Sequence, residues 1–128
     1  MADPTTWAPV GLYWPATQGD WVSSWVLFRR GGYVEGNHEF TISGKSCDTP
    51  INFGAGSRKI AIYSAEILGY SILINASAQA GEHFLNKRFP AHKRFLATIG
   101  WIVRIGGGVV LAKNALPHLA QWQKNGQL

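Results

Sequence analysis

Two long apolar stretches dominate the second half of the chain, and a short basic segment separates them. The first covers residues 60–80 and the second residues 95–116. Each is close to the roughly 20 residues that a helix needs to cross a bilayer. The pattern therefore predicts a two-helix hairpin over residues 58–116, possibly embedded in a membrane.

Both predicted helices carry small residues at helical spacing. Such residues let another helix backbone approach closely, which is the usual packing device between membrane helices. The expected packing positions are Ala61, Ala65 and Gly69 in the first helix and Gly100, Gly108 and Ala112 in the second. We expect the first helix to begin at Arg58, with Ser57 as its N-cap. A β-hairpin over residues 60–75 is the alternative, because Ile60 and Ile62 alternate with other residues there.

The segment between the two stretches, residues 87–94, is basic. A short loop rich in Lys and Arg is typical of the cytoplasmic side of a membrane hairpin. Further basic residues precede the first stretch. The positions that we expect to contact lipid head groups or a partner are Arg58, Lys59, Lys87, Arg88, Lys93 and Arg94.

Each apolar stretch carries one strongly charged residue in its middle, Glu66 in the first and Arg104 in the second. An unpaired charge at the bilayer centre costs at least about 2.5–3.5 kcal/mol on insertion scales. Two opposite charges at similar depth on neighbouring helices offset much of that cost. We therefore expect Glu66 and Arg104 to form an intramembrane pair.

The first 57 residues have a different character. Pro4, Pro9 and Pro15 predict an irregular, aromatic-rich arm at the start. Residues 33–44 alternate between apolar and polar side chains, which predicts short strands. The fold class expected is α+β, in a single domain. Its segments are an N-terminal aromatic and β-containing segment (1–57), the helical hairpin (58–116) and a polar tail (117–128).

Composition narrows the function classes. The chain has 128 residues, a net charge of +5 and a mean hydropathy close to zero. Its basic residues are spread in pairs, whereas a nucleic-acid-binding face usually shows a denser patch, so nucleic acid is an improbable partner. The single cysteine, Cys47, allows no intrachain disulfide, and no metal-binding spacing is present. We expect no cofactor, no metal and no catalytic residue.

These observations favour a membrane location and a non-catalytic role. The leading interpretation is a small subunit of a larger membrane-associated assembly, which contacts other protein subunits and lipid. One alternative is a soluble α+β domain that binds an acidic protein or nucleic acid. A further alternative is a membrane-active, toxin-like domain.

Overall fold

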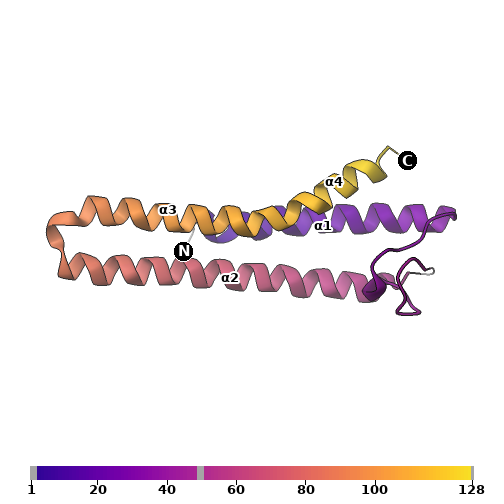
Figure 1. The fold of residues 1–128 in the computed structure, drawn as a ribbon, viewed down its shortest axis with the longest axis horizontal. Coiled ribbons are helices and arrows are strands. Elements are labelled where there is room, and N and C mark those ends of the chain that lie inside the picture. The colour runs from indigo at the N-terminus through magenta and orange to yellow at the C-terminus, as the bar shows by residue number, and fades with distance from the viewer. Residues whose placement is uncertain (1–2, 49–50, 128) are drawn as a thin grey trace. The chain divides into compact units, whose positions relative to one another are not determined.

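The computed structural model describes residues 3–48 and 51–127. Of the residues that the structure describes, 83% are helical. Its α-helices are α1 (Pro4–Arg30), α2 (Phe53–Arg88), α3 (Lys93–Ala112) and α4 (Leu116–Asn125), and its 3-10 helices are η1 (His38–Phe40), η2 (Pro90–His92) and η3 (Lys113–Ala115) (Figure 1).

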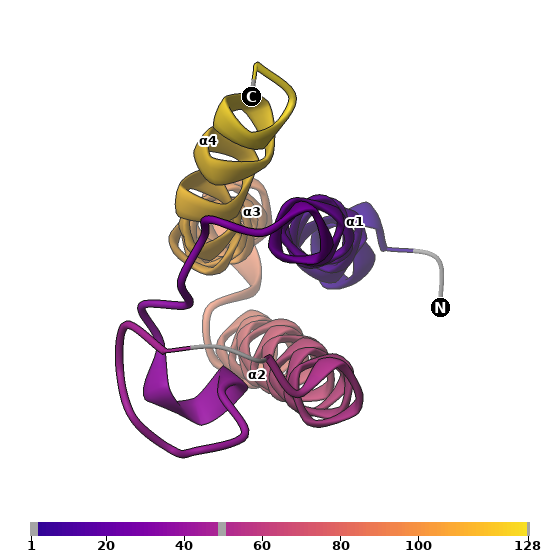
Figure 2. The ribbon, with the colours of Figure 1, turned by 90° about the vertical axis from the view of Figure 1, so that its right-hand side faces the viewer.

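The expected α+β class is wrong, because the described residues contain no strand. The alternating segment 33–44 makes only two isolated β-bridges, Glu35 with Asp48 and Thr41 with Ile51. Local hydrogen bonds replace a ladder there, since the Asn37 side chain caps η1 by accepting from the Glu39 backbone N–H at 3.0 Å. Figure 2 shows this connecting segment in purple beside the start of α2. Alternation alone does not make a sheet when no partner strand is available.

The prediction of an irregular N-terminal arm is also wrong, because these residues form the first part of α1. Pro4 occupies the first turn, where a missing N–H costs nothing. Asp3 precedes it and caps the helix, since its Oδ1 accepts from the Thr5 backbone N–H at 3.0 Å. Pro9 and Pro15 lie inside the helix. A proline there normally costs about 3 kcal/mol, so packing must compensate for it.

Helix α2 begins at Phe53, earlier than expected. Its N-cap is Asn52, whose Oδ1 accepts from the Ala55 backbone N–H at 3.0 Å. Ser57, the expected cap, lies one turn inside the helix. The segment from 60 to 75 is helical, so the β-hairpin alternative does not hold.

The polar tail is largely helical, because α4 covers most of it. Pro117 lies in the first turn of this helix. That position needs no backbone N–H, so proline starts a helix as readily as it ends one.

The chain divides into two compact units. The first unit comprises the residues up to Leu12 together with Ala65–Lys113. The second comprises Tyr13–Ser64 together with the residues from Asn114 onward. Helices α1 and α2 each contribute one part to either unit.

In the first unit, α2 and α3 form the hairpin. The chain reverses through η2, which follows the extended Phe89 and starts with Pro90 (Figure 1). Glycines on α3 allow close approach, because a Cβ on Gly107 would lie 2.9 Å from the Ile74 side chain of α2. The glycine run at residues 106–108 thus lies within a continuous helix and does not break it.

In the second unit, packing centres on Trp21 of α1. Its side chain is 4% exposed, and its Nε1 donates to the Phe53 carbonyl at 3.3 Å and to Ser57 Oγ at 3.1 Å. The indole stacks on the Phe53 ring with centroids 5.6 Å apart, and it also contacts the Phe40 ring. Gly56 lies directly under the indole, with no space for a Cβ.

The Gly56→Ala substitution should therefore destabilise the second unit. The new methyl group would overlap the Trp21 indole, and overpacking of this kind costs about 1–3 kcal/mol. Thermal unfolding of the detergent-solubilised chain, followed by circular dichroism, measures the effect. Gly69→Ala is the matched control, because a Cβ on this exposed helical glycine meets nothing within 4 Å. Equal melting temperatures for the two variants would contradict the packing described.

Candidate functional site

The interior of the first unit is unusually polar. Its buried residues, among those that the structure describes, are Pro9, Ile67, Ser71, Asn75, Gly100 and Arg104. Its outer surface is apolar instead, since Leu73, Ile102 and Val110 are 62%, 64% and 66% exposed. A soluble domain normally shows the opposite distribution. This unit therefore buries polar groups and presents hydrocarbon to its surroundings.

Two segments of the chain are long and apolar enough to cross a membrane, Phe53–Arg88 and Pro90–Asn125. Their most apolar windows are only 28% and 11% buried. The core helix of a soluble protein would be mostly buried. Here the rest of the chain covers only a small part of this apolar surface.

The centre of the polar interior is an ion pair. Arg104 Nη1 of α3 lies 2.8 Å from Asp3 Oδ2, and the two side chains are 10% and 18% exposed. Arg104 Nε also donates to the Gly100 carbonyl at 3.3 Å, and the guanidinium lies over the Trp101 ring, 4.2 Å from its centroid. The charge thus has both a counter-charge and further partners, which a buried ion requires.

Polar groups of α2 extend this network to the backbone of α1. The Thr5 hydroxyl lies 2.6 Å from both Asp3 Oδ1 and Asn75 Oδ1. The Ser71 hydroxyl lies 3.1 Å from the Thr5 carbonyl and 2.7 Å from the Thr6 carbonyl. The Thr5 carbonyl lacks its ordinary helical donor, because the residue four positions on is Pro9. Ser71 therefore supplies the hydrogen bond that proline removes.

The structure pairs Arg104 with Asp3, whereas Glu66 is exposed on α2. The distances along the helices explain this. Arg104 lies ten residues beyond Arg94, about 15 Å of helix, whereas Glu66 lies 21 residues before Lys87, about 31 Å. The two residues are thus at different depths. The dipeptide Asp3-Pro4 before Thr5 is a helix-start signal that could have identified the cap, although nothing local in sequence indicates its ion pair with Arg104.

The six expected packing positions divide between the two helices. A Cβ on Gly100 would lie 2.7 Å from Glu82 Oε2, and one on Gly108 would lie 3.9 Å from Pro9 Cγ, so both face neighbouring elements. Ala112 is half-buried, whereas Ala61, Ala65 and Gly69 lie on the exposed side of α2. The buried side of α2 is instead the row that contains Ser71 and Asn75.

Lys87 and Arg88 end α2, and Lys93 and Arg94 begin α3. Arg58 lies inside α2, because that helix begins at Phe53, and all five of these basic residues are exposed. Lys59 is half-buried and forms an ion pair with Glu39, with Nζ 2.6 Å from Oε1. The hydrogen bond from Lys59 is the main cause of the lowered pKa of Glu39. Lys59 is therefore engaged within the second unit.

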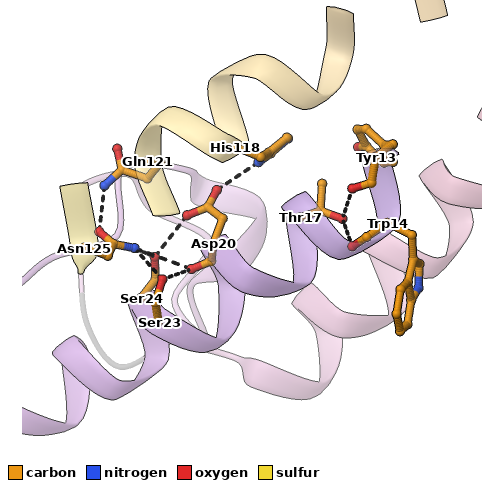
Figure 3. Close-up of polar contacts among 9 residues, drawn as sticks. All are labelled: Tyr13, Trp14, Thr17, Asp20, Ser23, Ser24, His118, Gln121 and Asn125. Atoms are coloured by element: carbon orange, nitrogen blue, oxygen red, sulfur yellow. Dashed lines mark hydrogen bonds and ion pairs between the residues drawn. The ribbon is translucent and has the colours of Figure 1, made fainter. Parts of the chain in front are cut away.

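The second unit contains a separate polar cluster, which sequence reasoning missed (Figure 3). His118 Nδ1 of α4 lies 2.8 Å from Asp20 Oδ2 of α1. Asn125 Nδ2 lies 2.9 Å from both Ser23 Oγ and Ser24 Oγ. A cavity of about 570 Å³ adjoins the cluster and is lined in part by aromatic side chains.

The cluster links α4 to α1. The Ser24 hydroxyl donates to Asp20 Oδ1 at 3.3 Å, and the edge of the His118 ring meets the Tyr13 ring. The Ser24 hydroxyl thus contacts both the carboxylate of Asp20 and the side-chain amide of Asn125. The described part of the chain also holds no group of three or more side chains that could bind a metal ion.

No family model, curated protein or solved structure matches this chain.

The Asp3→Asn substitution should destabilise the first unit at neutral pH. It leaves the buried Arg104 charge without its counter-charge, and breaking a buried pair in this way costs roughly 3–5 kcal/mol. Melting temperatures in detergent at pH 7 test this expectation. Glu66→Gln is the control, because an exposed carboxyl of this kind changes stability by no more than about 0.5 kcal/mol. If Asp3→Asn matched the unsubstituted chain at pH 7, the ion pair would not stabilise the unit.

Proposed function

We propose that the chain is a small, non-catalytic membrane subunit whose first unit lies in the bilayer. The observation that carries the proposal is the inverted distribution of polarity in that unit. Ser71, Asn75 and Arg104 are buried, whereas the aliphatic side chains of α3 point outward. Lipid is the environment in which this arrangement is favourable, because apolar side chains need no cover there and polar groups must be paired internally.

The lengths of the two helices support the proposal. From Arg94 to Lys113, α3 measures about 29 Å, and from Glu66 to Lys87, α2 measures about 31 Å. The hydrocarbon core of a bilayer is about 30 Å thick. Each helix therefore carries two charged residues that are separated by about the thickness of the hydrocarbon core. The basic elbow, residues 87–94, marks one surface and Glu66 with Lys113 marks the other.

The N-terminal turns of α1 fit the same frame. Asp3 pairs with Arg104, which is about 15 Å from the elbow and so near the bilayer centre. A helix end at that depth needs internal partners for its backbone groups. Asp3 caps the first turn, and Ser71 bonds the carbonyls of Thr5 and Thr6. In this proposal the start of α1 lies half-way into the bilayer.

A role as a subunit follows from surface that the unit leaves uncovered. The small residues Ala65 and Gly69 of this unit lie on the exposed side of α2, where a neighbouring helix can approach. The expected partners are other protein subunits and lipid, and the basic elbow faces anionic head groups. No step of catalysis is part of this proposal.

Membrane insertion and topology can be tested together. In a Cys47→Ser background, Ala91→Cys at the elbow and Lys113→Cys at the other end of α3 should react with a membrane-impermeant maleimide from opposite sides of sealed vesicles. Val103→Cys, which lies between them on α3, should stay unlabelled because lipid covers it. The chain should also remain in the membrane pellet after an alkaline carbonate wash.

Release by carbonate, or labelling of Val103→Cys as fast as of the two end positions, would overturn the proposal. Such a result would favour the alternative of a soluble binding domain. Labelling of both end positions from the same side would instead reject the spanning topology while leaving membrane association intact.

A further inference from the structure

An apolar groove runs along the first unit between α1 and α3. Its volume is about 380 Å³, and Ala8, Pro9 and Leu12 line one wall while Ile105, Val109 and Ala112 line the other. Gly108 forms the floor, with the Pro9 ring as its near neighbour. The groove is open to the surroundings of the unit because Gly108 and Ala8 have too little side chain to fill it.

The lining of the groove is suited to a hydrocarbon chain. Apart from Thr5, every lining residue is apolar. The Thr5 hydroxyl is already engaged with Asp3 and Asn75. An occupant thus finds contacts for methylene groups and few for hydrogen bonds.

A cation follows the groove residues in sequence. Ile105 and Val109 lie one turn apart on α3, and Lys113 comes four residues after Val109, as the first residue of η3. Lys113 is exposed and follows the last groove residue, Ala112. An occupant with an apolar chain in the groove and an anionic head group at Lys113 would match both features.

We propose that this groove binds one acyl chain of an anionic phospholipid, whose head group contacts Lys113. The inference rests on the proposed membrane location. It also specifies the leaflet in which the bound lipid lies. The elbow lies at one surface, and Ile105 to Ala112 cover the half of α3 that is farther from it. The lipid therefore belongs to the leaflet opposite the elbow, with its phosphate at the level of Lys113.

The probe is phosphatidylglycerol that carries a diazirine in one acyl chain, at low content in phosphatidylcholine vesicles that contain the purified chain. Photo-crosslinks, mapped by mass spectrometry, should concentrate on the peptides that contain Ala8 and Val109. Ala8→Phe should lower this crosslinking at least fivefold by filling the groove from its exposed wall. Val110→Phe is the matched control, because this residue is 66% exposed outside the groove and should leave crosslinking unchanged.

The head-group contact is tested separately. Lys113→Gln should lower crosslinking of phosphatidylglycerol about fivefold, while that of a diazirine-labelled phosphatidylcholine stays the same. Lys93→Gln, at the elbow, should change neither. Uniform crosslinking along α3, or insensitivity to Ala8→Phe, would overturn the inference, as would a crosslinked second copy of the chain in the groove. A carbonate wash of the same variants distinguishes loss of this site from loss of membrane insertion.

Discussion

The architecture of the first unit depends on the need to pair one buried charge. Arg104 is in the middle of a helix whose other faces are almost wholly aliphatic, and its side chain is only 10% exposed. Asp3 is the residue that satisfies it, and this requires the start of α1 to lie against α3. The same carboxylate caps α1, so one side chain both neutralises the arginine and starts the helix. A lysine at position 104 could not make the same set of contacts, because it lacks the planar fork that also bonds Gly100 and stacks on Trp101.

Packing around the pair then meets a second constraint, which Pro9 imposes. The proline leaves a carbonyl without its helical donor, and an unpaired carbonyl is costly in a dry environment. Ser71 of α2 lies beside that carbonyl. The proline ring in turn packs near Gly108 of α3. A residue that would weaken an isolated helix therefore ties α1 to both members of the hairpin.

The hairpin could be predicted from sequence, because apolar length and a basic turn are local signals. The N-terminal half could not, since Pro9 and Pro15 are ordinarily helix breakers, and the hydrogen bond from Ser71 that compensates for Pro9 comes from a distant part of the chain. The partner of Arg104 was missed for the same reason: Asp3 is 101 positions away, and no spacing rule connects them. Small residues also proved ambiguous, because Gly108 faces a neighbouring helix while Ala61, with the same type of spacing, is exposed.

The polar interior has a larger effect on which helix arrangement forms than on the free energy of unfolding of that arrangement. A buried ion pair offsets its desolvation cost only when its geometry is good, and an apolar replacement is often as stable. Aliphatic surfaces such as those of α2 and α3 can slide past each other with little change in contact area. Arg104, Asn75 and Ser71 permit only one register, because any shift along the helix would leave a charge or a carbonyl unpaired. The network thus specifies the position of α1 against the hairpin, and that position creates the groove beside Gly108.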